Sequence, residues 1–267
     1  MIDISVIIVN YQARGLVREC IKGLKMLSSH STYEVILVDN SNDLELARLL
    51  QERHSDVLYL GQQKNIGFGA ANNIGMRHAR GKYILILNYD ITPLPGSLDT
   101  LFEYMESHPE VGIAAPRLLN PDGSVQHSYY RFHGLFTPLY RRSALGRLPF
   151  ARRNLERFFM HDVKVSEPID VDWLLGACLF VRSSVLPTVG LMDERFFLYF
   201  EDTDWCRRFS ASGYRVRYVP LSRMIHLHKR DSARGSIFVS LFRRTTRIHI
   251  VSWIRYLYKW KGNPLQK

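Results

Sequence analysis

Apolar residues in the first half of the chain follow two alternating patterns. Short β-branched runs, such as Ile4–Val9, are typical of buried strands in a parallel sheet. Longer stretches with apolar residues three and four positions apart predict helices between them. Strands are predicted at Ile4–Val9, Glu34–Val38, Val57–Leu60, Tyr83–Leu87 and Val111–Ala115, and helices at Leu16–Leu27, Leu44–Arg53, Gly69–Ala79 and Ser97–Ser107. This alternation predicts an α/β fold with a mostly parallel central sheet flanked by helices.

The second half of the chain has a less regular pattern. Residues Tyr129–Glu167 show no clear period and are rich in Arg, Phe and Pro. We therefore expect a long, mobile insertion that lies over the functional site of the protein. Regular patterns then return. Strands are predicted at Val171–Leu174, Cys178–Val181 and Arg215–Val219, and a helix at Asp202–Ser212.

The C-terminal tail, residues 232–267, contains no Asp or Glu and combines aromatic and aliphatic residues with Arg and Lys. A basic amphipathic segment of this kind is typical of a helix that lies on an anionic membrane surface. A C-terminal helix that packs on the core with a basic outer face has the same composition. The sequence leaves both interpretations open.

Composition narrows the class of protein. Of the 267 residues, 46% are hydrophobic and 23% are charged, which is ordinary for a globular chain of one large domain with a tail. The formal net charge of +11 favours an anionic partner, although a solvated basic surface gives the same charge. A nucleotide and an acidic membrane surface both fit. No recognised nucleic-acid motif is present, so we expect no nucleic-acid partner.

The N-terminus and the cysteines indicate where the protein works. Cys20, Cys178 and Cys206 are odd in number and widely spaced, so neither a disulfide framework nor a zinc site is expected. The chain starts directly with a strand pattern, and we expect no signal peptide and no membrane-spanning helix. These features predict a cytoplasmic protein, which would lie on the inner face of the cell membrane if the tail binds lipid.

Polar residues follow three predicted strands at their carboxyl ends, where ligands bind in open α/β sheets. They are Asn10-Tyr11, Asp39-Asn40 and Asn88-Tyr89-Asp90. Asp and Asn at such a position can hydrogen-bond the base or ribose of a nucleotide. They also favour Asx turns and helix caps, so a purely structural role stays open.

A glycine-containing loop, Asn65–Asn73, precedes the third predicted helix. Gly67 and Gly69 allow the backbone to approach a ligand closely, and the helix start offers free N–H groups. The loop is not a dinucleotide-binding fingerprint, because Asn72 stands where the third glycine belongs. A loop that simply closes onto a helix remains the alternative.

Two further motifs carry metal-binding and acid–base chemistry. Asp90, after a buried strand, is well placed to hold a divalent cation that bridges a diphosphate, and His226 is a second possible ligand. The alternatives are a turn aspartate and a structural histidine, and the neighbouring His228 makes the assignment ambiguous. Glu201 and Asp202 follow an aromatic run and can supply a general base. Acidic residues at a helix start also favour the helix dipole, and both roles can hold together.

These motifs together resemble those of a known family. Their order along the chain is Val9-Asn10-Tyr11, Val38-Asp39-Asn40, Asn65-x-Gly67-Phe68 through Asn72-Asn73, Asn88-x-Asp90, Gly176-Ala177, Phe196–Asp204 and His226. This order resembles that of the family 2 inverting glycosyltransferases, and most of all their bacterial rhamnosyltransferase branch. Each motif is weak alone, but seven in this order and spacing are specific.

The resemblance implies a GT-A fold over residues 1–231, with a nucleotide-sugar-binding half at 1–116 and an acceptor and catalytic half at 117–231. It implies a dTDP or UDP sugar as donor, with rhamnose as the sugar suggested at family level. A Mg²⁺ or Mn²⁺ ion is implied as cofactor. The implied acceptor is a hydroxyl of a glycan or lipid-linked glycan in bacterial cell-surface polysaccharide biosynthesis.

The resemblance also assigns roles to residues by position. Asp202 matches the general base, with Glu201 beside it, and Asp90 and His226 match the metal ligands. Asn88 stands where many relatives carry Asp, which leaves one anionic ligand fewer. Donor contacts are implied at Asn10, Tyr11, Asp39, Asn40, Asn65, Gly67, Phe68, Asn73 and Asn88, and acceptor contacts at Trp173, Gly176 and Ala177.

Two other functions compete with glycosyl transfer. A sugar-phosphate nucleotidyltransferase also binds a nucleotide and a metal, but usually carries a glycine-rich basic loop after the first strand. Asn10–Arg14 contains no glycine. A non-catalytic protein that binds anionic surfaces fits the net charge, but it leaves the ordered acidic motifs unexplained.

Overall fold

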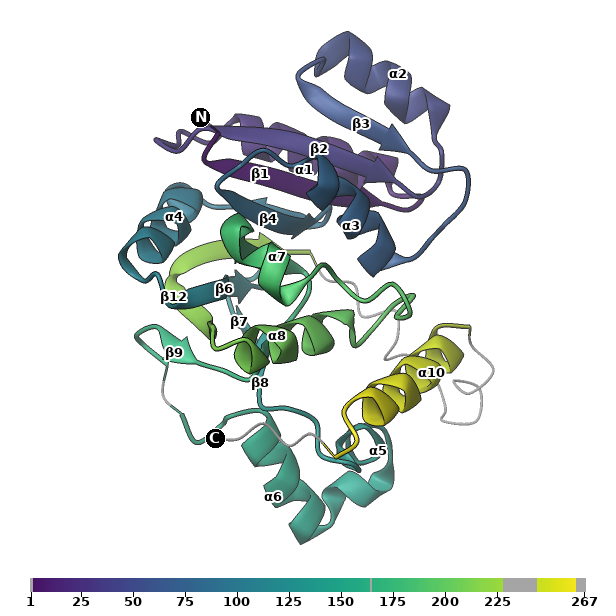
Figure 1. Ribbon diagram of the computed structural model, residues 1–267, viewed down its shortest axis with the longest axis vertical. Coiled ribbons are helices and arrows are strands. Elements are labelled where there is room, and N and C mark those ends of the chain that lie inside the picture. Colours follow the sequence, from purple (N-terminus) through teal and green to yellow (C-terminus); the bar gives the residue numbers. More distant parts are fainter. Residues whose placement is uncertain (1, 164, 228–243, 263–267) are drawn as a thin grey trace.

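The computed structural model describes residues 2–163, 165–227 and 244–262 (Figure 1). Its centre is a mixed sheet in the strand order β3-β2-β1-β4-β11-β6-β12-β5, with β7 paired to β6 and β9 to β12. The strands are β1 (Ile4–Asn10), β2 (Tyr33–Asp39), β3 (Val57–Gly61), β4 (Tyr83–Asn88), β5 (Ile91–Pro93), β6 (Val111–Leu119), β7 (Val125–Gln126), β8 (Tyr129–Tyr130), β9 (Ile169–Asp170), β10 (Trp173–Leu174), β11 (Cys178–Arg182) and β12 (Arg215–His226).

Helices cover both faces of this sheet. They are α1 (Arg14–Lys25), α2 (Leu44–Arg53), α3 (Phe68–His78), α4 (Ser97–Ser107), α5 (Thr137–Arg142), α6 (Pro149–Phe158), α7 (Leu186–Val189), α8 (Glu201–Ala211) and α10 (Arg244–Lys259), with short 3₁₀ turns η1 (Ala144–Arg147) and η2 (Ser183–Val185). No helix in the described part of the chain combines the length and the apolar character needed to cross a membrane.

The N-terminal part of the sheet is parallel, as the alternating pattern predicts. β1 pairs with β2 and β4, and β2 pairs with β3, all in parallel. The sheet is mixed beyond β4, because β11 runs antiparallel between β4 and β6. Asn10, Asp39 and Asn88 therefore lie at one edge, where β1, β2 and β4 all end, and Asn10 is in register with Asp39.

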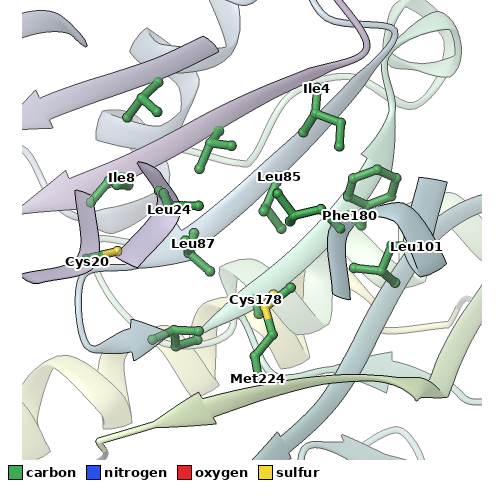
Figure 2. Packing of buried hydrophobic residues seen from close by; sticks show 14 of the residues in the cluster. Ile4, Ile8, Cys20, Leu24, Leu85, Leu87, Leu101, Cys178, Phe180 and Met224 are labelled. Carbon is green, nitrogen blue, oxygen red and sulfur yellow. Dashed lines mark hydrogen bonds between the residues drawn. The ribbon is translucent and has the colours of Figure 1, made fainter. Parts of the chain in front are cut away.

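Alternating residues of the central strands form two cores. Ile4, Val6 and Ile8 of β1 face α1 and α4, whereas Ile7 packs in the second core with residues of α8. Figure 2 shows the first core, in which side chains of β1, β4 and β11 meet Cys20 and Leu24 of α1. Strands buried on both faces explain the continuous apolar runs in the sequence.

The segment Tyr129–Glu167, in which the sequence shows no clear period, nevertheless contains regular elements. This segment forms β8, α5, η1 and α6 in its described residues, and its aromatic residues pack on Trp173. α6 buries only Ala151 and Phe158. The last strand is also longer than predicted, because β12 continues to His226.

In the described part of the C-terminal tail, α10 packs against α8 and the segment that precedes it (Figure 1). Tyr256 is 1% exposed and contacts the ring of Phe200. The opposite face is open, since Val251, Ile254 and Tyr258 are exposed. One face of the tail therefore packs on the core. The predicted tail residues 232–243 and 263–267, like His228, lie outside the described residues.

Candidate active site

Asn10 and Asp39 form the first cluster at the sheet edge. Asn10 Nδ2 donates to Asp39 Oδ1 at 2.8 Å, and Tyr59 donates its hydroxyl proton to Asp39 Oδ2 at 2.7 Å. The backbone N–H groups of Ser41 and Asp43 donate to the same carboxylate. Burial opposes ionisation of Asp39, but these hydrogen bonds outweigh it and lower the pKa of Asp39. Asp39 is fully buried, and its hydrogen bonds with the Ser41 and Asp43 N–H groups order the loop after β2.

A pocket of about 380 Å³ opens beside this cluster. Gln12, Arg14, Ser41 and Asp43 line it, and Arg14 Nε donates to Asp43 Oδ2 at 2.8 Å. Tyr11, adjacent in sequence to Gln12, is 43% exposed. The loops after β1 and β2 thus line a cavity with polar and charged groups, and an exposed aromatic residue precedes Gln12 in the chain.

The loop before α3 is joined to the segment before α8. Gly67 has a φ of +92°, and a Cβ there would lie 2.4 Å from the carbonyl oxygen of Phe197. The Phe68 N–H donates to that same carbonyl at 2.9 Å. Asn40 Nδ2 donates to the Gly67 carbonyl, and Asn65 Oδ1 accepts from the Gly67 N–H. Only glycine fits this position without strain.

Asn73 has a different environment from the other predicted donor residues. Its Nδ2 donates to the Met192 carbonyl at 2.8 Å, and its Oδ1 accepts from the Met192 N–H at 3.0 Å. Glu194 accepts a further hydrogen bond from Nδ2. The buried Asn73 amide thus holds the 192–194 segment against α3.

Asp90 and His226 lie next to each other, although they come from opposite halves of the chain. β5 pairs with the end of β12, which brings the turn containing Asp90 to His226. Asp90 Oδ1 lies 3.3 Å from His226 Nε2. On the other side of the ring, Nδ1 donates to Gln126 Oε1 at 2.7 Å. Nε2 is then the nitrogen directed at Asp90.

The Asp90–His226 pair has the chemistry of half a divalent-cation site. Carboxylate oxygen and imidazole nitrogen are both ligands of Mn²⁺, and carboxylate oxygen also suits Mg²⁺. Neighbouring ligands of an octahedral ion lie about 3.0 Å apart when the bonds are about 2.1 Å. The 3.3 Å separation is close to that value. Within the described residues no cluster of three or more His, Cys, Asp or Glu forms a complete site.

Glu201 and Asp202 begin α8 and are 4% and 9% exposed. Asp202 Oδ2 accepts from the Gly176 N–H at 2.9 Å, and Oδ1 accepts from the Thr203 N–H at 2.7 Å. Glu201 Oε2 is buried without a hydrogen-bond partner among the described residues. The backbone therefore stabilises the Asp202 anion and leaves Glu201 less compensated.

Burial shifts both carboxyl groups. It raises the pKa of Glu201 well above its usual range, and the Asp202 charge raises it further. Burial also raises the pKa of Asp202, but the hydrogen bonds from Gly176 and Thr203 oppose the rise. Two carboxyl groups this close do not both ionise easily, and the group that accepts hydrogen bonds from N–H donors is the one whose anion is stabilised. This arrangement favours ionised Asp202 beside protonated Glu201.

The backbone before these carboxylates is strained. Tyr199 and Phe200 both have positive φ, at 70° and 69°. Such a conformation costs on the order of 1 kcal/mol or more for a residue with a side chain and is concentrated at functional sites. The positive φ values turn the chain sharply into α8 and bury the first two carboxylates.

Gly176 and Ala177 connect the two halves of the site. The Gly176 N–H binds Asp202, while the Ala177 carbonyl accepts from the Asn88 N–H at 2.8 Å. Asp202 is thus bonded to Gly176, and the next residue, Ala177, is bonded to Asn88 at the end of β4, two residues before Asp90. Trp173, by contrast, lies in an aromatic cluster with Tyr130, 4.3 Å between ring centroids, and is 6% exposed.

Two residues to which the sequence analysis gave no role support this site. Gln126 orients His226, and Asp204 anchors α10 through Lys259 Nζ at 2.9 Å and Trp260 Nε1 at 2.9 Å. A run of acids in Phe196–Asp204 hints at Asp204. Gln126 has no sequence signal, because only the β6–β7 pairing brings it to the site.

Comparison with known proteins identifies the family of this chain. The family model described as glycosyl transferase family 2 matches residues 5–162. The chain belongs to glycosyl transferase family 2. Membership in this family decides for glycosyl transfer over nucleotidyl transfer and over a non-catalytic role.

Two relatives from this family are rhamnosyltransferases. The chain is 32% identical to the N-acetylglucosaminyl-diphospho-decaprenol L-rhamnosyltransferase of Mycobacterium tuberculosis, over 77% of this chain and 70% of that one. It is 27% identical to the rhamnosyltransferase WbbL of Escherichia coli, over 95% and 92% of the two chains. The predicted resemblance to the bacterial rhamnosyltransferase branch is confirmed.

A solved structure confirms the GT-A fold. GalNAc-T7, determined with UDP, GalNAc and Mn²⁺, superposes with a TM-score of 0.71 at 16% identity. The match covers 98% of this chain and 49% of that one, so the chain spans about half the length of GalNAc-T7. At this identity the match supports the fold alone.

Proposed function

We propose that this enzyme transfers rhamnose from a dTDP or UDP sugar to a hydroxyl of a lipid-linked glycan, with inversion at the anomeric carbon. The observation that carries the proposal is the buried Glu201–Asp202 pair, in which the Gly176 and Thr203 N–H groups support only Asp202. The rhamnosyltransferase relatives support the sugar and the class of acceptor.

In this proposal the donor binds at the edge formed by β1, β2 and β4. Its base and ribose occupy the pocket beside Tyr11 and Ser41, while Asn10, Asp39 and Asn40 hold the surrounding loops in place. Asn65, Gly67 and Phe68 bring the backbone close to the sugar. Residues 1–116 are then the donor half of the enzyme.

The diphosphate is assigned to the Asp90–His226 end of the site. Asp90 and His226 would hold a Mg²⁺ or Mn²⁺ ion, with the remaining ligands from the diphosphate and water. Such an ion, when bound, neutralises the negative charge that grows on the leaving diphosphate. Asn88 at the end of β4 provides an amide where a second carboxylate would stand, so the ion is held by few protein anions.

Asp202 acts as general base in a single displacement. It accepts the proton of the acceptor hydroxyl while that oxygen forms a bond to the anomeric carbon and the bond to the diphosphate breaks. Glu201, kept protonated by burial, places no second negative charge beside the base. The acceptor lies near Trp173, Gly176 and Ala177, within the half formed by residues 117–231.

A lipid-linked acceptor would bring the enzyme to the cytoplasmic face of the membrane. The outer face of α10 supports a peripheral contact there, because Val251, Ile254 and Tyr258 are exposed beside arginines. Anionic lipid attracts such a basic, partly apolar helix.

A donor screen tests the proposal. Purified enzyme is incubated with dTDP-rhamnose, UDP sugars and GDP sugars, with and without Mn²⁺, and nucleoside diphosphate release is measured with and without an N-acetylglucosaminyl-diphospho-prenol acceptor. We expect acceptor-dependent release from dTDP-rhamnose. The anomeric configuration of the product, determined by NMR, tests inversion. Release from no sugar nucleotide under any condition would contradict the proposal.

A further inference from the structure

A second pocket, of about 300 Å³, lies between α10 and the segment before α8. It is lined by three arginines, three apolar residues and one serine: Arg244, Arg247, Arg255, Phe197, Ile248, Val251 and Ser252. Among the described residues that line it, none is acidic. The pocket is thus cationic and apolar at once, unlike the polar pocket beside β1 and β2.

The cations of this pocket are available for a ligand. Arg244 and Arg247 are exposed and form no hydrogen bond or ion pair with the part of the chain that the structure describes. Arg255 donates to the Arg195 carbonyl and helps to fix α10 in place. Guanidinium groups without acidic partners bind phosphate oxygens well, since their paired N–H groups match the spacing of two oxygens.

The pocket adjoins the active site. The Phe197 carbonyl accepts a hydrogen bond from the Phe68 N–H of the donor loop, so a residue that lines the pocket is bonded directly to that loop. Ser252 Oγ of α10 donates to the Leu198 carbonyl at 2.9 Å. From Leu198 only two residues lead to Glu201. A ligand in this pocket would therefore contact Phe197, which is bonded to the donor loop and stands four residues before Glu201 in the chain.

We propose that this pocket binds the diphosphate and the first isoprene units of a prenyl-diphosphate-linked acceptor. The assignment rests on the proposed function for the class of acceptor. Arg244 and Arg247 would bind the diphosphate, and Phe197, Ile248 and Val251 would contact the prenyl chain. A free phosphate would not contact the apolar residues of this pocket. A nucleotide is already assigned to the polar pocket and the Asp90–His226 site.

Calorimetry with a short prenyl diphosphate tests the assignment. The donor site is first saturated with Mn²⁺ and the nucleoside diphosphate that the enzyme binds most tightly. Farnesyl diphosphate, inorganic pyrophosphate and farnesol are then titrated separately. We expect farnesyl diphosphate to bind more tightly than pyrophosphate or farnesol, because only farnesyl diphosphate contacts both the arginines and the apolar residues of the pocket.

Variants assign the binding to the pocket. The double variant R244Q/R247Q should weaken farnesyl diphosphate by at least about tenfold, since two charge-assisted contacts are lost. V251N should weaken farnesyl diphosphate while pyrophosphate binding stays the same or nearly so, because the substitution removes an apolar contact without adding a charge beside Arg247. R18Q/R53Q, with the same charge loss on α1 and α2, is the matched control and should bind as the native protein does.

Two results would overturn the assignment. One is native affinity of R244Q/R247Q for farnesyl diphosphate, or an equal loss in R18Q/R53Q. The other is a loss of nucleoside diphosphate affinity in R244Q/R247Q, which would place these arginines in the donor site. Because the assay measures binding, failure of the donor screen would refute the proposed function without altering this result.

Discussion

The backbone N–H of Gly176 lies 2.9 Å from Oδ2 of Asp202 and donates a hydrogen bond to it. A Cβ at position 176 would lie 3.2 Å from both Oδ2 and Cβ of Asp202, which is a tight contact. The absence of a side chain at Gly176 therefore allows the carboxylate to approach the backbone. This contact fixes the direction of the candidate base.

Gly176→Ala should displace the Asp202 carboxylate by a few tenths of an ångström. We expect kcat to fall by about tenfold while donor affinity changes little, because misplacement of a reacting group costs rate and spares remote binding. Steady-state kinetics and donor calorimetry measure the two effects. Gly15→Ala, where a Cβ meets nothing within 4 Å, is the matched control. Equal kinetics for both variants would count against the positioning role.

Asp202→Asn should retain donor binding and lose transfer by about 10² to 10⁴, the range for loss of a general base. The side chain keeps nearly the same shape, so the thermal midpoint should change little. Glu201→Gln should retain more of the rate, because a protonated Glu201 is already neutral. A dead Glu201→Gln beside a fully active Asp202→Asn would show that the wrong carboxylate was assigned as the base.

The raised pKa of Glu201 predicts how stability depends on pH. A Glu side chain in the unfolded chain has a pKa of about 4.3, whereas the pKa of Glu201 in the folded protein is higher. Above about pH 4.3 the folded protein therefore keeps the Glu201 proton that the unfolded chain has lost. This contribution to stability is present at low pH and is lost as pH rises through the folded-state pKa. The free energy of unfolding of Glu201→Gln minus that of the native protein should therefore increase as pH rises. Urea denaturation of both proteins from about pH 5 to about pH 8 measures the difference. A difference that is constant with pH would contradict the prediction.

Asp90→Ala should abolish donor turnover in a folded protein, because it removes the anionic half of the Asp90–His226 pair. Nucleoside diphosphate release and a thermal melt test the two parts of this statement. Electron paramagnetic resonance of Mn²⁺ gives a readout independent of turnover, and we expect weaker Mn²⁺ binding. Asp122→Ala, at an exposed turn, is the control. Native turnover in folded Asp90→Ala would exclude Asp90 as a ligand.

The outer face of α10 should bind anionic vesicles in a salt-dependent manner. We expect sedimentation with phosphatidylglycerol vesicles to decrease as salt rises and to be weak with phosphatidylcholine. Ile254→Asp combined with Tyr258→Asp should reduce binding without unfolding the protein, since both side chains are exposed. Leu44→Asp, on exposed α2, should have no effect. Binding that persists in the α10 variant would place the lipid contact elsewhere.

The sequence by itself predicted most of the elements between residues 1 and 116, although not the short strand β5. β1, β2 and β4 are buried on both faces, so their apolar runs stand out, and polar residues follow each of them. α2 and α4 have the predicted bounds, because each has one buried face and one exposed face. The order of the motifs was enough to indicate the family, which the family match confirms.

Only the tertiary structure decided which polar residues meet. Asp90 reaches His226 because β5 pairs with β12, and Gln126 reaches His226 through a two-residue strand. These contacts depend on pairings between distant segments, which leave no period in a single sequence. The same holds for the Gly176–Asp202 hydrogen bond and for the ion pair by which Lys259 holds α10 against Asp204. Local pattern is set by local burial, whereas the chemistry of this site is set by long-range packing.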